Sequence, residues 1–350
     1  MSVTRAGVTR AGVTWANMTR RRLAALAAGC VAGLALPATR TLAQAPAPTP
    51  APIPAWPQRP VRFIVPLGPA SGADIGARLL ADRLPARWGK PVVIENRPGA
   101  DGLVAIGAFV NAADDHTLLF TPAGSFTVHP LQYTKLPYVP EDLVPIARVS
   151  NTIIAIGVPA SLKIGSLAEF AKYARAESGK LNAAVVSGIT EFTFDYFVKT
   201  SGLSIAKVPY RDIVQAATDL SEGRLQVMMS SYAILQPHVQ AGRVKVLAVN
   251  GHERSSILPG IPTANESGFP ALEVEGLVGL FGPRGISNEL REKIAADVVA
   301  VAADPTIAER LAGTAQVPNP GGPAEFAAAI ARQRAQIAVI AQALGPIPKQ

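Results

Sequence analysis

Short runs rich in β-branched residues alternate along the chain with longer segments in which apolar residues recur every three or four positions. The first run, 61–65, predicts a buried strand, and residues 75–84 after it predict a helix. Seven more strands are predicted, near residues 92–95, 117–120, 153–158, 183–186, 226–229, 244–249 and 278–281. Strands that alternate with helices favour parallel α/β sheets.

Helix start and stop signals sharpen this pattern. The sequence of Ser166–Glu169 is that of a capping box, and Ser287 begins another helix. An alanine-rich helix is predicted over about 323–344, with its large apolar residues on one side. Pro85 stands inside an otherwise helical run, so the first helix is expected to kink or stop near Leu84.

The turn between the first strand and the first helix, residues 66–74, is made of small residues. A strand that enters a helix through glycine and serine leaves the first backbone N–H groups of the helix without intrahelical partners, and the positive end of the helix dipole faces the turn. The turn is therefore a candidate site for a small anion. A tight connection that binds nothing is the alternative.

The N-terminal 45 residues have the features of an export signal. Three consecutive arginines at 20–22 precede an Ala/Leu run that is too short to span a membrane comfortably, and Ala43–Ala45 is a small-residue cleavage site. We expect cleavage after Ala45, with the Sec pathway favoured over the twin-arginine pathway. Met18 is a possible true start, because it brings the arginines to the N-terminus.

This leader also explains the charge of the chain. The formal net charge is +8, but residues 1–45 hold six arginines and no acidic residue, which leaves 27 basic and 25 acidic side chains in the remainder. A mature charge near +2 argues against a nucleic-acid partner. The lone Cys30 lies in the leader, where lipidation is an alternative, so a mature chain cut after Ala45 has neither a disulfide nor a thiolate nucleophile.

Residues 46–58 are rich in proline and predict an extended tether that does not pack until the strand at 61 begins.

Signals for catalysis and for metal binding are weak. The four histidines, at 116, 129, 238 and 252, form no H-E-x-x-H pattern and have no cysteine partners. There is no G-x-S-x-G motif, and the turn at 66–74 is neither a dinucleotide fingerprint nor a Walker A motif. No metal, cofactor or catalytic residue is therefore predicted.

Five long segments follow one another in a recognisable order. They read WPQRPVRFIVPLGPASGADIGARLLADRL, GKPVVIENRPGADG, LLFTPAGSFTVHPLQYTKLPYVPEDLVPIA, KVPYRDIVQAATDLSEGRLQVM and VKVLAVNGHERSSILPGIPTANESGFPALEVEGLVGLFGPRG. In these segments the chain resembles the Bug-type extracytoplasmic solute receptors, which are the substrate-binding proteins of tripartite tricarboxylate transporters. The resemblance covers most of residues 57–345.

The resemblance implies an α/β fold of the two-lobed periplasmic binding protein kind (type II), each lobe a largely parallel sheet flanked by helices. On that basis the chain divides into an export signal (1–45), a tether (46–58), the first part of lobe 1 (59–157), lobe 2 (158–273) and the second part of lobe 1 (274–350). The chain is expected to cross between the lobes near 156–158 and 272–276.

The resemblance also implies that four loops hold a ligand carboxylate between the lobes, largely through backbone N–H groups. The residues predicted to bind the ligand are Ala70, Ser71, Gly72, Ala73, Asp74, Ser125, Phe126, Ser187, Gly188, Thr190, Glu191 and Ser230. A helix N-cap role for Asp74, a turn role for Ser125 and core packing for Phe126 are open alternatives.

Two of these residues depart from the family pattern. Glu191 stands near a position often held by histidine, and Ser230 replaces a common aspartate. Because a glutamate that faces a carboxylate would repel it, either Glu191 points to solvent in the first turn of its helix, or the ligand carries a cationic or donor group that Glu191 accepts. The usual ligand of the family is therefore not assigned to this chain.

We interpret the chain as a periplasmic receptor, without catalytic activity and without a cofactor, that closes on a small organic carboxylate and delivers it to a membrane transporter. The carboxylate could also bear an amino or aromatic group. The chain is expected to be a monomer. Two other classes remain open: a receptor that signals to a membrane sensor without transport, and an exported enzyme on the same fold.

Overall fold

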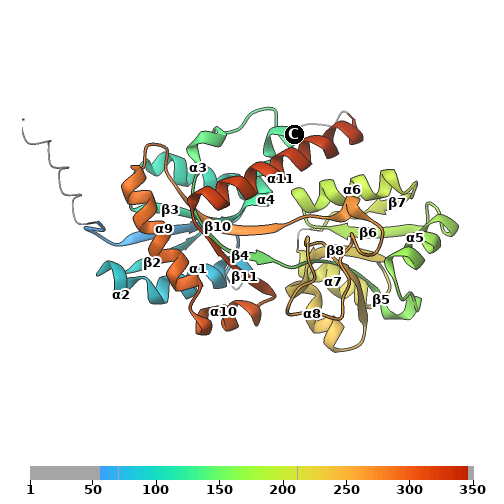
Figure 1. Cartoon of the computed structure of the whole chain (residues 1–350). Helices are drawn as coiled ribbons and strands as arrows, with labels where there is room; N and C mark the ends of the chain where they lie inside the picture. The colour runs from blue at the N-terminus through green and yellow to red at the C-terminus, as the bar shows by residue number, and fades with distance from the viewer. Residues whose placement is uncertain (1–55, 70, 211, 346–350) are drawn as a thin grey trace, which may run out of the picture. The chain divides into compact units, whose positions relative to one another are not determined.

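The computed structural model describes residues 56–69, 71–210 and 212–345, all of which belong to the compact unit Ile53–Gln350. The predicted export signal, its cleavage site after Ala45, the start at Met18 and Cys30 lie outside the described residues. Two mixed β-sheets organise the described part, each covered by helices on both faces (Figure 1).

The first sheet has six strands in the order β11-β4-β10-β3-β1-β2. Their bounds are β1 (Val61–Val65), β2 (Val92–Asn96), β3 (Thr117–Pro122), β4 (Val144–Thr152), β10 (Gly276–Gly282) and β11 (Gln316–Gly321). Strand β1 is parallel to β2 and β3, whereas β10 runs antiparallel to β3 and β4, and β11 runs antiparallel to β4. We call this sheet with its helices the first lobe.

The second sheet has five strands in the order β7-β6-β8-β5-β9. Their bounds are β5 (Ile154–Pro159), β6 (Leu181–Val185), β7 (Ile205–Lys207), β8 (Val227–Ser231) and β9 (Val244–Val249). Strand β6 is parallel to β7 and β8, and β5 runs antiparallel to β8 and β9. This sheet and its helices form the second lobe.

Two passages of the chain join the lobes. Strand β4 ends at Thr152 in the first sheet and β5 begins at Ile154 in the second, so the first crossover is at Ile153, a few residues before the expected position. Residues 250–275 connect β9 to β10 and form the second crossover. Strand β5 enters the second sheet from the first lobe, and β10 enters the first sheet from the second lobe. Both are antiparallel to their neighbours. The predicted two-lobed α/β fold is therefore confirmed, but its sheets are mixed and not largely parallel.

Eleven α-helices are described. They are α1 (Gly72–Arg83), α2 (Pro85–Trp88), α3 (Leu103–Ala112), α4 (Ala123–Gln132), α5 (Leu167–Ala176), α6 (Ile189–Thr200), α7 (Ile213–Ser221), α8 (Tyr232–Gln240), α9 (Asn288–Ala302), α10 (Pro305–Ala312) and α11 (Pro323–Leu344). Short 3₁₀ turns occur at Ala100–Gly102, Pro140–Asp142, Ala160–Leu162 and Pro270–Leu272. The helix starts predicted at Ser166 and Ser287 are confirmed, since both side chains accept a backbone N–H of the first turn. Helix α1 ends at Arg83 and Pro85 opens α2, as the proline requires.

Separate hydrophobic clusters fill the two faces of the first sheet. One contains Leu80, Ile294 and Leu311 from α1, α9 and α10. The other contains Phe109 and Phe326 from α3 and α11. The first sheet is thus sandwiched between two layers of helices.

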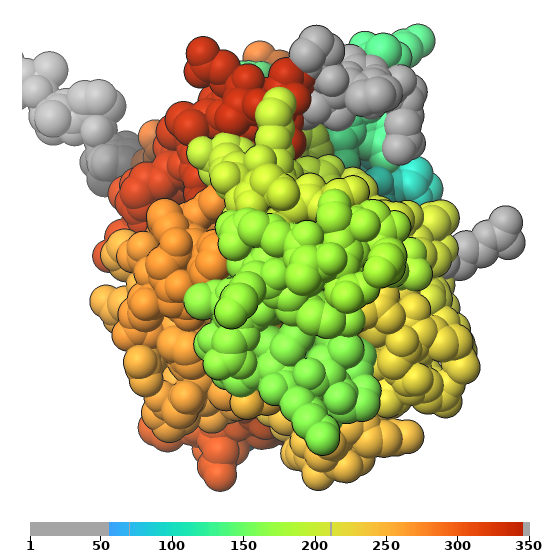
Figure 2. All heavy atoms as spheres, turned by 90° about the vertical axis from the view of Figure 1, so that its right-hand side faces the viewer, coloured from blue at the N-terminus to red at the C-terminus, as the bar shows by residue number. Residues whose placement is uncertain are grey.

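Helix α11 belongs to both lobes. Its first half packs Phe326 on Phe281, with ring centroids 5.0 Å apart, in the core of the first lobe. Its second half buries Ile337 and Ile340 in the core of the second lobe, and in Figure 2 this red segment lies directly against the yellow-green residues of α6. The expectation that all of 274–350 belongs to the first lobe therefore does not describe the end of α11.

The last residues of the expected tether are packed. The side chain of Trp56 is 8 % exposed, lies edge-on to Trp88 at 4.9 Å, and donates from Nε1 to the carbonyl oxygen of Asp115. An indole buries enough apolar surface to order the chain before β1 begins. The prediction that residues before 61 do not pack is wrong for Trp56 and Pro57, and residues 46–55 lie outside the described part.

No helix among the described residues is long and apolar enough to cross a membrane.

Candidate ligand site

The turn before α1 is held by its own side chains. Ser71 is the N-cap residue, and its Oγ accepts the N–H of Asp74 at 3.3 Å. The carboxylate of Asp74 is buried and accepts hydrogen bonds from Asn96 Nδ2 at 2.8 Å and from Arg78 Nε at 2.9 Å. The bond to Asp74 is also the main reason that the pKa of Arg78 is raised. The N-cap role proposed for Asp74 thus belongs to Ser71.

A buried glutamine supports the same turn from the far end of the chain. Gln316 of β11 donates from Nε2 to the carbonyl oxygen of Gly72 at 2.6 Å and accepts the Ser150 hydroxyl at 2.7 Å. Its side chain is fully buried. No local pattern in the sequence indicates this role of Gln316, because Gly72 lies 244 positions away. Ala73 is buried beside this bond, and Ala70 lies outside the described residues.

The N-termini of α4 and α6, one from each lobe, meet directly. A Cβ atom built on Gly124 would lie 2.5 Å from Ile189 Cγ2, and one built on Gly188 would lie 3.5 Å from the carbonyl oxygen of Gly124. Gly188 is the N-cap of α6 and has φ 92°, which favours glycine. In the described structure neither helix has a side-chain cap, so side chains satisfy none of the first N–H groups of either helix, although Glu191 N–H bonds the carbonyl oxygen of Gly188 at 3.1 Å.

The two serines near this contact differ in exposure. Ser125 in the first turn of α4 is half-buried, and Ser187 before α6 is exposed. Thr190, the second residue of α6, is buried.

Three aromatic side chains near these loops belong to the hydrophobic cores. Phe126 is 3 % exposed and lies edge-on to Phe281, with centroids 5.2 Å apart. Phe192 and Phe194 are buried in the core of the second lobe. Core packing, the alternative considered for Phe126, accounts for its position.

Glu191 has an intramolecular partner. Lys207 Nζ, at the end of β7, lies 2.6 Å from Glu191 Oε1 and 2.7 Å from Asp195 Oδ2. Burial alone would lower the pKa of Lys207, but its hydrogen bonds to Asp195 and Glu191 outweigh burial and raise it. The pKa of Asp195 is raised, mainly by burial. Glu191 thus shares an intramolecular cation with Asp195, so a ligand cation is not needed to explain its position.

Ser230 is enclosed in the second sheet. It is fully buried in β8, pairs with Ala155 of β5, and donates its hydroxyl hydrogen to the carbonyl oxygen of Ser231 at 3.2 Å. The position that often carries an aspartate in the family is thus a satisfied, neutral hydroxyl in this chain.

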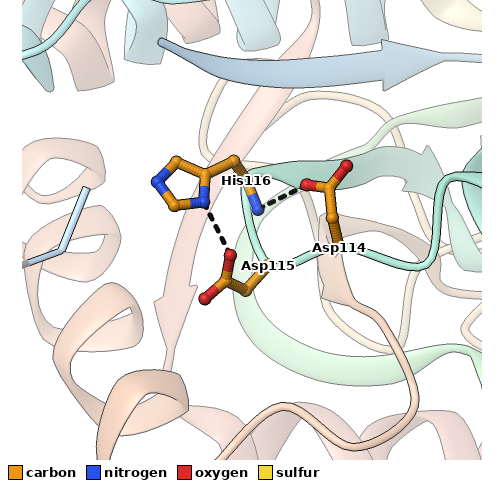
Figure 3. Close-up of side chains that lie close together, drawn as sticks. All are labelled: Asp114, Asp115 and His116. Carbon is orange, nitrogen blue, oxygen red and sulfur yellow. Dashed lines mark hydrogen bonds and ion pairs between the residues drawn. The ribbon is translucent and has the colours of Figure 1, made fainter. Parts of the chain in front are cut away.

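Asp114, Asp115 and His116 are close enough together to suggest a metal centre (Figure 3). Their atoms are used within the chain: His116 Nδ1 bonds Asp115 at 2.6 Å, and His116 Nε2 accepts the backbone N–H of Gln58 at 3.1 Å. Asp114 accepts the backbone N–H of His116 and pairs with Arg59 at 3.1 Å. We assign the cluster a structural role, because it fastens residues 58 and 59 to the first lobe.

Residues 76–345 match the family model described as tripartite tricarboxylate transporter family receptor. The chain belongs to this family. Among relatives of the receptor, BugT of Bordetella pertussis is 29% identical over 240 residues, which cover 67% of this chain and 74% of BugT.

Solved structures agree with the family assignment. Rpa4515 of R. palustris, solved with adipate, is 28% identical with a TM-score of 0.74, and the match covers 84% of this chain and 99% of that one. MatC of Rhodopseudomonas palustris, with bound malate, is 25% identical with a TM-score of 0.70, and covers 83% and 100%. The family is one of receptors, and these two neighbours were solved with adipate and with malate.

Proposed function

We propose that the protein is a periplasmic receptor that binds a small organic carboxylate between its lobes and delivers it to a tripartite tricarboxylate-type transporter. The observation that carries the proposal is the contact between the uncapped N-termini of α4 and α6. Backbone N–H groups at a helix N-terminus attract anions, and here such groups from two lobes converge. A carboxylate bridging them would favour the closed arrangement of the lobes.

The ligand class follows from relatives and from local charge. Rpa4515 was solved with adipate and MatC with malate, which are both dicarboxylates. In this chain Lys207 offsets one of the two charges of Glu191 and Asp195, and Ser230 adds no charge. We therefore propose a dianionic or monoanionic ligand held mainly by backbone donors, with Ser125, Ser187, Gly188 and Thr190 closest to it.

The proposal includes the cellular location and the oligomeric state of the protein. We propose export by a signal cleaved after Ala45, through the Sec pathway, and a monomeric receptor in the periplasm. N-terminal sequencing of the protein from a periplasmic extract tests the cleavage site. Detection of the mature protein only in the cytoplasm would contradict export.

The direct test is a search for the ligand. Native mass spectrometry of freshly purified protein detects a retained small molecule, and a thermal-shift screen of C3 to C8 mono- and dicarboxylates detects binding in the ligand-free protein. Stabilisation grows with ligand concentration as RT ln(1 + [L]/Kd), so a true ligand at about 100 times its Kd adds roughly 2.7 kcal/mol. Folded, ligand-free protein that responds to no carboxylate would contradict the proposal.

A receptor that signals to a membrane sensor would bind the same ligand. Deletion of the gene for this protein separates the two roles. A transport receptor is needed for uptake of the labelled carboxylate, whereas a sensing receptor is needed only for the transcriptional response to it. An exported enzyme would instead convert the ligand, which mass spectrometry of the incubated ligand detects.

A further inference from the structure

Helix α11 contacts both of the helices that meet at the candidate ligand site. It packs against α4 of the first lobe and against α6 of the second lobe (Figure 1). At its C-terminal end, the carbonyl oxygen of Leu344 accepts a hydrogen bond from Lys199 Nζ of α6 at 3.0 Å. Its middle carries Gln333, a buried side chain with hydrogen-bond partners in two other elements. Gln333 is therefore placed to connect parts of the two lobes that are far apart in the sequence.

One partner of Gln333 lies where the two crossovers run side by side. The first residue of β10 pairs with Thr152, the last residue of β4, and a Cβ atom built on that first residue, a glycine, would strike the Thr152 carbonyl oxygen. We call residues 152–154 and 274–276 the hinge, because both crossovers pass between the lobes there. Gln333 donates from Nε2 to the carbonyl oxygen of Glu275 at 2.8 Å, so it fastens α11 to the hinge.

The other partner of Gln333 lies in α4, one turn after the contact between the lobes. Gln333 Oε1 accepts a hydrogen bond from the Thr127 hydroxyl at 3.2 Å. Thr127 is buried and follows Gly124 by three positions, so both residues lie on the same face of α4. Gly124 in turn lies against Ile189 of α6. A single buried side chain thus joins the hinge to the start of α4.

The hydrogen-bonding chemistry of these groups fixes which atom faces which partner. The Glu275 carbonyl oxygen can only accept, so Gln333 must present Nε2 to the hinge and Oε1 to α4. Thr127 has one hydroxyl hydrogen and two acceptors within reach, Gln333 Oε1 at 3.2 Å and the carbonyl oxygen of Gly124 at 3.3 Å. No other donor to Gln333 Oε1 occurs among the described residues, and a buried acceptor without a donor is destabilising. The hydroxyl hydrogen therefore belongs to Gln333 in this arrangement of the lobes.

A bond between α4 and α11 at this place affects how the lobes are oriented. The part of α11 that follows Gln333 is buried in the core of the second lobe through Ile337 and Ile340. Gln336 fixes the same part of α11 to the second crossover, because it donates to the carbonyl oxygen of Glu273 at 2.5 Å. Without the bond to α4, the first lobe could turn at the hinge at a lower cost in free energy. The contact between α4 and α6 would then be one of several populated arrangements.

We propose that Thr127 and Gln333 are positioning residues, whose hydrogen bond sets the orientation of the α4 start relative to the hinge and thereby favours the lobe arrangement in which α4 meets α6. Neither side chain needs to touch the ligand for this role. The inference rests on the proposed function, because a carboxylate would bridge the lobes in this arrangement, but its main test needs no ligand. A larger population of the binding arrangement increases the apparent affinity in proportion.

Distances between spin labels measure the lobe orientation directly. The mature chain expected after cleavage at Ala45 has no cysteine, so nitroxides on Asp82→Cys of α1 and Lys172→Cys of α5, two exposed positions in different lobes, report only the distance between the lobes. Thr127→Val keeps the shape of the side chain and removes the hydroxyl. It should broaden the distance distribution of the ligand-free protein, measured by double electron–electron resonance. Thr127→Ser retains the hydroxyl and should keep the wild-type width.

Two further variants separate this hydrogen bond from a general loosening of the fold. Gln333→Met should broaden the distribution at least as much as Thr127→Val, and the double variant should be no broader than Gln333→Met alone, because both changes remove the same bond. Thr193→Val is the matched control. Thr193 is a buried threonine of α6 whose hydroxyl donates, among the described residues, only to the carbonyl oxygen of Ile189 in its own helix, at 2.8 Å. Its loss should leave the width unchanged.

Ligand affinity gives a second measurement. Calorimetric titrations with adipate and with malate should give a Kd about three- to tenfold higher for Thr127→Val and Gln333→Met than for the wild type, and an unchanged Kd for Thr127→Ser and Thr193→Val. Wild-type distance distributions in both Thr127→Val and Gln333→Met would overturn the proposal, and so would equal broadening in Thr193→Val. A wild-type protein that binds neither acid would contradict the proposed ligand class, and the distance distributions would still decide the role of Thr127 and Gln333.

Discussion

The turn before α1 and the junction of α4 with α6 are both strand-to-helix connections rich in small residues, but they are stabilised in different ways. The α1 turn is closed on itself, since Ser71 caps the helix and Asp74 is bonded to Arg78 and Asn96. Among the residues that the structure describes, no side chain caps the start of α4 or of α6, and the two starts instead touch each other across the lobes. A strand-turn-helix pattern therefore indicates where backbone donors collect, and the caps decide which of them remain available to a ligand.

The largest expected effect, on the free energy of unfolding, is at Asp74 in the α1 turn. Replacing it by alanine removes the acceptor of Asn96 and Arg78 in a buried position, so Asp74→Ala should lower the free energy of unfolding by about 2–3 kcal/mol. This expected loss is smaller than that for a fully buried ion pair, because Arg78 is half-exposed. Urea unfolding measures it.

Asp82→Ala is the matched control, because Asp82 is an exposed acid of the same helix. It should change stability by less than about 0.5 kcal/mol. If Asp74→Ala left stability unchanged and abolished ligand binding, Asp74 would be a ligand contact and the contrast between the two regions would fail.

The second prediction concerns the α4–α6 contact. A methyl group on Gly124 would press on Ile189, so Gly124→Ala should hold the lobes apart and weaken carboxylate binding by about 1.5–2 kcal/mol, or roughly 10- to 30-fold. Calorimetry with the carboxylate found in the thermal-shift screen measures the change. Gly107→Ala on α3, where a Cβ meets nothing within 4 Å, should leave affinity unchanged.

A double variant tests the geometry directly. Ile189→Ala removes the atoms that the new methyl group would strike, so Gly124→Ala/Ile189→Ala should recover most of the lost affinity. Additive losses in the double variant would show that the two residues do not meet in the ligand-bound state.

Local signals in the sequence were enough to predict many of the helices and strands. The capping serines, the strand-turn-helix at 61–84 and the long last helix all depend on neighbours within a few positions, and each occurs where it was predicted. Strand β11 was missed because Pro318 argues against a strand, yet β11 lies at the edge of its sheet, where a residue without a backbone donor is tolerated.

The interactions that define the site are not local. Gln316 reaches Gly72 from the other end of the chain, and Lys207 reaches Glu191 from the next strand. Residue spacing contains no information about such partners. The direction of the strands was also mistaken for the same reason, because periodicity shows that a segment is a strand but not from which lobe the chain enters it.

A third prediction concerns His129, a buried residue near the C-terminal end of α4. His129 is fully buried; its Nε2 bonds the carbonyl oxygen of Asp101 at 3.2 Å, so Nε2 carries the hydrogen and Nδ1 accepts from the Tyr138 hydroxyl at 2.8 Å. Burial lowers the pKa of His129 below its ordinary value. The folded protein therefore keeps the neutral ring at a pH where the unfolded chain already binds a proton.

The sign of the pH dependence follows. Above about pH 6.5 the ring is neutral in both the folded and the unfolded state. Below that pH the unfolded state gains a proton first. The free energy of unfolding therefore decreases as the pH is lowered, by at most about 1.4 kcal/mol per pH unit, until the pKa of the folded state is reached. His129→Gln should lack this component between pH 6.5 and 5. Urea unfolding at several pH values gives both slopes, and identical slopes would show that His129 titrates normally in the fold.

The smallest predicted effect is at Glu191, and it decides between the explanations of that residue. Lys207 is bonded to Glu191 and Asp195, so Glu191→Gln should change carboxylate affinity by less than about threefold, as should the control Asp195→Asn. A gain of tenfold or more in Glu191→Gln would mean that the ligand carboxylate experiences an unscreened repulsion. A loss of that size, absent from Asp195→Asn, would mean that Glu191 accepts a hydrogen bond from a donor group of the ligand. Either result would move Glu191 into the ligand site, and with it the α6 start would bind through a side chain as well as through its backbone.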